Sequence, residues 1–148
     1  MVEPLAGWRH IAVTERRTKQ DYARCLQWLV DVAFPHAQSI RLVQDNLNTH
    51  QPSALYETFP PAEARRILRK LELHYTPKHG SWLNMAEIEI SIVERGCLSR
   101  PVGDVLTLCQ RVEALEAERN GAHCTIRWHF TNAQARVKLQ RLYPEVPT

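Results

Sequence analysis

Short extended runs alternate with amphipathic helical patterns in the first half of the chain, and this alternation constrains the fold more than any other feature. The extended runs are Trp8 to Val13, Ile40 to Asp45 and Leu71 to Tyr75. Between them, periodic apolar residues predict one helix from Thr18 to about Pro35 and another from Pro61 to Lys70. Strands that alternate with helices are typical of an α/β layered fold, which we therefore expect.

The first of these helices has clear boundary signals. Thr18 is a preferred N-cap residue, and Asp21 three positions later completes a capping box. Apolar residues then recur every three or four positions, and the pattern ends near Pro35. The strand at Ile40 to Asp45 is rich in β-branched residues, so we expect much of its surface to be buried.

Helical patterns fill the second half of the chain. One helix begins at Ser81 or Asn84 and runs to about Arg95. Another covers positions 102 to about 120 and is closed by the pair Asn120-Gly121. After a brief extended piece, Thr131 caps a last helix.

A single domain accounts for all 148 residues, because this length matches one ordinary globular domain. No run approaches 18 consecutive apolar residues and the first 20 residues carry no signal-peptide pattern, so we expect no membrane partner and a cytoplasmic location. The four cysteines form no C-x-x-C pair, which favours reduced thiols over a zinc module. The formal net charge of +3 permits a nucleic-acid partner without requiring one.

Two acidic residues are candidates for a metal site. Asp45 stands at the carboxyl end of a predicted strand, the edge where open α/β sheets bind ligands. Glu87 lies on the helix that follows the next strand, so the two carboxylates can converge on one cleft. Oxygen ligands of this kind suit Mg²⁺ or Mn²⁺, and two such metals would activate a water or a 3′-hydroxyl against a phosphodiester. The alternative is that Asp45 only caps the turn that it forms with Asn46 and Asn48.

Two sequence blocks carry a family resemblance. VQDNLNTH at positions 43–50 and HYTPKHGSWLNMAE at positions 74–87 resemble the DDE-type transposases, in particular the bacterial insertion-sequence transposases related to the mariner superfamily. The run at 128–144 resembles the end of the same proteins, so the resemblance covers essentially the whole chain. It implies an α/β fold with a ribonuclease-H-like catalytic core and C-terminal helices. It also implies metal-dependent DNA cleavage and strand transfer, with Asp45 and Glu87 as the catalytic, metal-binding carboxylates of a two-metal Mg²⁺ or Mn²⁺ site.

The same resemblance gives positioning roles to four further residues. Asn46 and His50 match the family pattern of Asp-Asn followed by His, which implies that they position the metal-bound water or a DNA phosphate. Lys78 and His79 precede the helix of Glu87 and are candidates for phosphate contacts. The alternatives are turn formation by Asn46 and solvated surface side chains at the other three positions.

The chain departs from the family in its first carboxylate. The family uses three, and the first lies on a core strand upstream of the segment matched here; no aspartate precedes Asp21, which belongs to the helix cap. We therefore expect residues 1–148 to be a partial catalytic domain, N-terminally truncated, without the first core strand and with one edge of the strand at 40–44 unpaired. The metal site would be incomplete and catalysis by this chain alone is doubtful.

Partners follow from the same comparison. Transposon-end DNA is the implied substrate, and an upstream-encoded part of the transposase and a second copy of this chain are candidate partners. The chain lacks a helix-turn-helix module, so the scattered basic residues predict weak, salt-dependent and non-specific DNA binding. The alternative function is a catalytically inactive transposase remnant, or a non-specific DNA-binding accessory fragment.

The third carboxylate has two candidates, Glu87 and Glu89. The spacing Leu-Asn-x-x-Glu of the family selects Glu87. At 100° per residue, Glu87 shares a polar lane with Asn84 and Ser91 between two apolar groups, so we expect the helix to be buried on both sides with this lane facing a cleft. Glu89 falls on the other flank, where we expect no polar companions.

Overall fold

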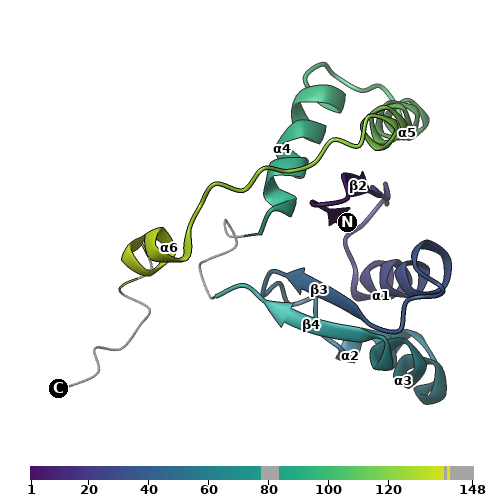
Figure 1. The fold of residues 1–148 in the computed structure, drawn as a ribbon. Helices are drawn as coiled ribbons and strands as arrows, with labels where there is room; N and C mark the ends of the chain where they lie inside the picture. Colours follow the sequence, from purple (N-terminus) through teal and green to yellow (C-terminus); the bar gives the residue numbers. More distant parts are fainter. Residues whose placement is uncertain (78–83, 139, 141–148) are drawn as a thin grey trace.

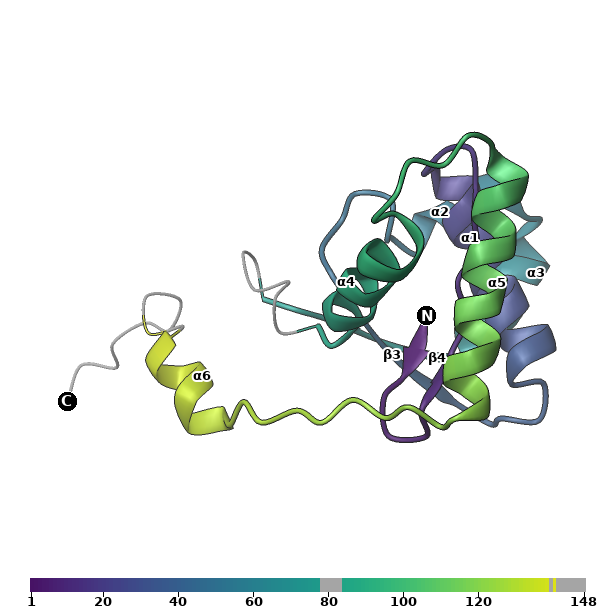
Figure 2. The same cartoon turned by 90° about the horizontal axis from the view of Figure 1, so that it is seen from above.

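The computed structural model describes residues 1–77, 84–138 and 140. Two small sheets and several helices make up this part of the chain, which is compatible with an α/β fold. Figures 1 and 2 show the sheet of β3 and β4 with α1, α2 and α3 close to it, and α4, α5 and the N-terminal hairpin on the other side. The last helix, α6, lies away from both groups at the end of an extended segment.

The two strands predicted at 40–45 and 71–75 are present, and they form a parallel pair. β3 (Ile40–Gln44) pairs with β4 (Leu71–Tyr75) in a register that sets Ile40 opposite Leu71 and Gln44 opposite Tyr75. The connection between them contains α2 (Ser53–Thr58) and α3 (Pro61–Arg69), and Pro61 occupies the first helical position as predicted. Helix α2 was not predicted, because Pro52 stands at its N-cap and makes no side-chain cap hydrogen bond.

Helix α1 (Lys19–Trp28) begins as the sequence predicts. The Asp21 amide donates to the Thr18 hydroxyl, and the Asp21 carboxylate accepts from the Thr18 amide, so the capping box is complete. A π-helical turn, η1 (Leu29–Ala33), extends α1 and buries both Leu29 and Val30.

The main core lies between the helices and one face of the β3–β4 sheet. The partly buried Ile40, Leu42 and Leu71 of the sheet pack against a fully buried cluster from α1, η1, α2 and α3. The members of this cluster are Ala23, Leu26, Val30, Ala54, Leu55, Ala64 and Ile67. The other face of β3 is open to solvent, since Val43 on that face is 51% exposed. Our expectation that much of this strand is buried therefore holds for one face only.

The N-terminal strand is shorter than predicted. β1 (Val2–Glu3) and β2 (Trp8–Arg9) form an antiparallel pair, and the strand predicted to reach Val13 ends at Arg9. The Ile11 amide donates to the Glu116 carboxylate at 2.7 Å. A side chain of α5 thus accepts a hydrogen bond that a neighbouring strand would otherwise accept.

A glycine allows the hairpin to dock on the end of α5. Gly7 has a φ of +69°, and a Cβ atom there would lie 2.5 Å from the carbonyl carbon of His123. Only glycine combines this conformation with so close a backbone approach.

The second half contains α4 (Ala86–Cys97), α5 (Val105–Gly121) and α6 (Asn132–Lys138). Thr131 and Gln134 form a capping interaction at the start of α6, which confirms the predicted cap. α5 ends at Gly121, within the predicted closing pair Asn120-Gly121, but it begins at Val105 rather than at 102, and the positive φ after it falls on His123. In the described ranges no helix is long and apolar enough to cross a membrane, and all four cysteines are free.

Candidate functional site

Asp45 and His50 form the centre of the candidate site. Asp45 directly follows β3, and one of its carboxylate oxygens lies 2.5 Å from His50 Nδ1. Both side chains reach solvent, with exposed fractions of 38% for Asp45 and 27% for His50. The pair therefore presents a carboxylate and an imidazole to solvent at the carboxyl end of the parallel strands, where α/β folds bind ligands.

A partly buried hydrogen-bond network holds the His50 segment in place. The His50 ring packs on Tyr22 with centroids 4.8 Å apart, and the Tyr22 hydroxyl donates to Gln44 Oε1 at 2.7 Å. Gln44 Nε2 and the Tyr75 hydroxyl each donate to the His50 carbonyl at 3.1 Å. Burial raises the pKa of Tyr22 to about 12, although the hydrogen bond to Gln44 opposes this shift, so Tyr22 remains a neutral donor at physiological pH.

Asn46 joins the two loops that follow the parallel strands. Its side-chain amide donates to the Thr76 carbonyl, and the Thr76 amide in turn donates to the Gln44 carbonyl at 2.9 Å. Asn46 thus connects the Asp45 loop to the segment after β4, a role that local turn chemistry does not reveal. Nearby in sequence, Thr49 Oγ1 is buried without a hydrogen-bond partner among the described residues.

The two glutamates of α4 have opposite environments. Glu87 is exposed in the first turn of the helix, where Asn84 accepts from its amide at 3.0 Å. Glu89 is 5% exposed, and one oxygen of its carboxylate accepts from Arg9 Nε at 3.0 Å and from Arg119 Nε at 2.9 Å. Our expectation that Glu89 lacks polar companions was wrong, because these arginines come from β2 and α5 and no local pattern reveals them.

The expected burial of α4 on both sides was also wrong. Ile88 is 38% exposed and Ile90 is 55% exposed, and Glu89 and Cys97 are the buried residues of the described helix. α4 packs against α5, and its Glu89 also pairs with Arg9 of β2. Figures 1 and 2 place the first turn of α4, which carries Glu87, on the side of the sheet where β3 and β4 end.

Lys78 and His79 lie outside the described residues, and so does most of the segment that joins β4 to α4. Of the six predicted site residues, the structure describes Asp45, Asn46, His50 and Glu87. It brings the first three together in one network. Within the described ranges, no hydrogen bond or ion pair joins Glu87 to Asp45.

The predicted ligand atoms are oxygens, the atom type that a hard divalent cation prefers. Asp45 and Glu87 offer carboxylate oxygens, and the orphaned Thr49 hydroxyl shows that the Asp45 loop has unused capacity for a polar ligand. Their number is incomplete, since the described part of the chain holds no cluster of three or more His, Cys, Asp or Glu side chains of the kind that holds a metal.

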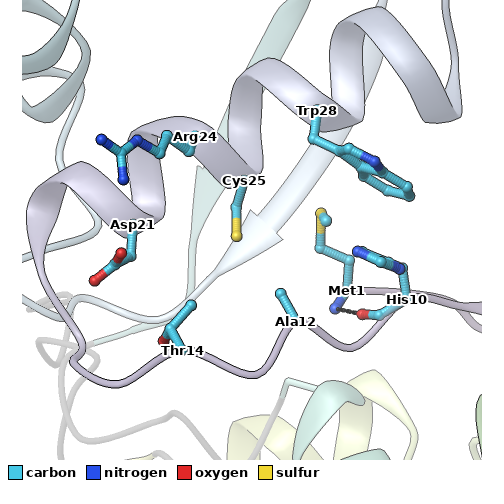
Figure 3. A pocket seen from close by; sticks show the side chains of 8 residues that line it. All are labelled: Met1, His10, Ala12, Thr14, Asp21, Arg24, Cys25 and Trp28. Atoms are coloured by element: carbon cyan, nitrogen blue, oxygen red, sulfur yellow. Dashed lines mark hydrogen bonds between the residues drawn. The ribbon is translucent and has the colours of Figure 1, made fainter. Parts of the chain in front are cut away.

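A pocket of about 320 Å³ lies elsewhere, between the N-terminal segment and α1. Figure 3 shows the Cys25 thiol directed toward the segment that carries Ala12 and Thr14, and burial raises the pKa of this thiol. None of the described site residues lines this pocket, so it is separate from the Asp45 site; its lining consists of Met1, His10, Ala12, Thr14, Asp21, Arg24, Cys25 and Trp28.

Comparison with known families gives one match. The model of a family described as DDE superfamily endonuclease matches residues 1–109, a range that includes β3, β4 and α4 with both Asp45 and Glu87. Searches of curated proteins and of solved structures returned no match.

Proposed function

Because this chain belongs to the DDE superfamily endonucleases, we propose that it contributes two carboxylates, Asp45 and Glu87, to the metal-dependent cleavage and strand transfer of DNA in transposition. The observation that carries this proposal is the family match, which includes both acids in one matched range. DNA is the substrate class at the level of the family, and transposon ends are the finer proposal.

Glu87 is the better candidate for the second of these carboxylates. It is exposed, and it belongs to the helical turn that lies near the carboxyl ends of the parallel strands. Glu89 is neutralised by two arginines and withdrawn from solvent, so using it as a ligand would require breaking two ion pairs.

Each site residue has a distinct task in the proposed mechanism. A divalent cation held by Asp45 and Glu87 would supply Lewis-acid activation of the phosphodiester and of the attacking hydroxyl. Asp45 fixes the His50 ring through Nδ1, and the ring packs against Tyr22, so His50 is oriented to position a DNA phosphate. Asn46 holds the Asp45 loop against the segment after β4, which limits movement of the carboxylate.

The proposed core requires a further strand. Within the described residues, β3 pairs with β4 alone, so one edge of β3 remains available for main-chain hydrogen bonds. We propose that β3 and β4 belong to a ribonuclease-H-like core completed at this edge by another segment of the transposase, which brings the remaining carboxylate. The family pattern of three carboxylates supports this arrangement.

Site-directed cleavage of the polypeptide by bound iron tests the metal site without DNA. Fe²⁺ that replaces Mg²⁺ generates hydroxyl radicals with ascorbate and peroxide, and these cut the backbone near the metal. We expect cuts near positions 45 and 87 that Mg²⁺ or Mn²⁺ suppresses by competition. Asp45→Asn and Glu87→Gln should weaken both cuts, whereas Glu94→Gln, on an exposed position of the same helix, should not.

Supercoiled plasmid separates the proposal from its alternative. Cuts near both positions with little plasmid nicking indicate an incomplete catalytic domain. An absence of localised cuts would instead favour an inactive remnant or a non-specific DNA-binding fragment. Strong Mg²⁺- or Mn²⁺-dependent nicking that Asp45→Ala abolishes would show that two carboxylates suffice, contrary to the proposed need for a third.

A further inference from the structure

The C-terminal arm, residues 127–138, lies outside the matched range of the family and has no role in the proposed catalytic site. Figures 1 and 2 both show it extending from the end of α5 away from the rest of the chain. No residue of the arm is buried, and α6 at its end buries none of its side chains.

The base of the arm is firmly attached. Ile126 is 7% exposed and its amide donates to the Pro4 carbonyl at 3.0 Å. Two residues earlier, the Cys124 carbonyl accepts from Arg9 Nη2 at 2.5 Å. The arm thus projects from a fixed point on the hairpin and α5, rather than continuing from a loose chain end.

The chemistry of the arm is one-sided. The sequence has no Asp or Glu between Glu118 and Glu145, whereas Arg127, Arg136 and Lys138 are all exposed on the arm. The adjacent Trp128 is 36% exposed and meets Phe130 edge to face, with ring centroids 6.1 Å apart. Exposed cations interleaved with an aromatic pair are the composition of a nucleic-acid contact surface.

We propose that the C-terminal arm is a DNA-binding arm, in which Arg127, Arg136 and Lys138 contact backbone phosphates and Trp128 packs against the nucleic acid. The inference rests on the proposed function for its choice of partner, since a DDE endonuclease acts on DNA. Charge favours DNA over a second copy of the chain, because the chain carries a net charge of +3 and a second copy would on balance repel the cationic arm, whereas DNA attracts it.

Coupled ordering is expected of α6. A helix of seven residues is marginal without tertiary packing, and Thr131 with Gln134 caps only its first turn. Phosphate contacts by Arg136 and Lys138 would stabilise this helix on DNA. The helical content of the arm should therefore rise when DNA is added.

Fluorescence anisotropy with a labelled duplex, in EDTA, measures the arm independently of any metal site. We expect the triple variant R127Q/R136Q/K138Q to reduce the slope of log Kd against log salt by about 3, near 0.9 per lost phosphate contact. The matched control R16Q/R65Q/R69Q removes the same charge from exposed positions elsewhere and should reduce the slope by less than about 1.

Trp128 provides a second readout. DNA should quench a fluorescence component that is lost in Trp128→Phe, and Trp128→Ala should weaken binding by about fivefold or more. Because the arm contains no buried residue, all arm variants should keep the thermal unfolding midpoint of the unmodified chain.

Three outcomes would overturn the arm proposal. One is an equal loss of DNA binding in the arm variant and the charge-matched control. Another is unchanged DNA binding together with a shift from dimer to monomer in sedimentation, which would assign the arm to a second copy. The third is no DNA binding by the unmodified chain at low salt. The iron cleavage at positions 45 and 87 is measured without DNA, so failure of the arm and failure of the catalytic proposal remain distinguishable.

Discussion

Glu89→Ala removes the counter-ion of a fully buried arginine. Arg9 has a side-chain exposure of 0%, and Glu89 is the acid that pairs with it. The same carboxylate pairs with Arg119, whose side chain is 19% exposed. The substitution therefore leaves one guanidinium in the interior without an opposite charge, and a second one near the surface.

The expected cost follows from these exposures. Breaking a buried pair by removing one partner destabilises proteins by about 3–5 kcal/mol. Arg9 also donates to the carbonyls of Gly7 and Cys124 and to the Asn120 side chain, and these neutral acceptors offset part of the loss. Arg119 reaches water and adds little. We expect about 3 kcal/mol, a large fraction of the 5–15 kcal/mol typical of a domain, or a melting temperature lower by about 6–12 °C.

Urea unfolding followed by tryptophan fluorescence measures this change, since Trp8 adjoins Arg9. The urea midpoint should fall with the slope m unchanged. Glu87→Ala is the matched control on the same helix, and because Glu87 is exposed we expect a change within about 0.5 kcal/mol. The double variant Arg9→Met/Glu89→Leu should recover much of the stability, because no buried charge remains. A cost below about 1 kcal/mol for Glu89→Ala, equal to that of Glu87→Ala, would refute the reasoning.

Three further predictions concern the fold. Gly7→Ala should destabilise the chain by about 2–4 kcal/mol in urea unfolding, because φ is positive and the new Cβ would lie 2.5 Å from a backbone atom. The control Gly103→Ala, whose Cβ would have no atom within 4 Å, should change the stability by less than about 0.5 kcal/mol. Equal effects of the two substitutions would contradict this prediction. Thr18→Ala should cost about 1 kcal/mol. Hydrogen bonds from Thr18 hold the Asp21 pKa below 3.8, so the cap stabilises the fold above that pH, and this stabilisation is lost as the pH falls through the lower pKa of the folded state. Carboxyl NMR should show the Asp21 pKa rising in Thr18→Ala. An unchanged pKa would show that Thr18 does not cause the shift. The Tyr22 hydroxyl should ionise with a pKa of about 12 in an absorbance titration, and the stability of the fold should fall as the pH rises from about 10 toward 12. Tyr22→Phe should remove the absorbance change near pH 12. If that change persists in the variant, it does not belong to Tyr22.

Local signals predicted most of the elements that carry the site. The capping box of Thr18 and Asp21, the proline that opens α3 and the strand at 71–75 are confirmed, and the strand predicted at 40–45 ends one residue earlier, at Gln44. These features depend on residues within one helical turn or one strand, so their information is present in a short window of sequence. The family blocks around Asp45 and Glu87 likewise led to the family that the match over residues 1–109 shows.

Contacts between distant residues decided the rest. The Ile11 amide beyond the end of β2 donates to Glu116 of α5, and the hydrogen bond from Asn46 to Thr76 joins two loops that are separate in sequence. The catalytic role of Glu87 remains a prediction, but the structure shows that Glu87 is exposed and that Glu89 is buried.

The sequence by itself determined the family, most of the strands and helices apart from β1 and α2, and the acids at positions 45 and 87 as candidates, because these depend on local patterns and short motifs. Only the tertiary structure decided which glutamate of α4 is buried. Helical periodicity ranks positions by angle but does not say what faces them. Glu89 is buried because Arg9 and Arg119, 80 positions before it and 30 after it, meet it from two other elements and satisfy its charge.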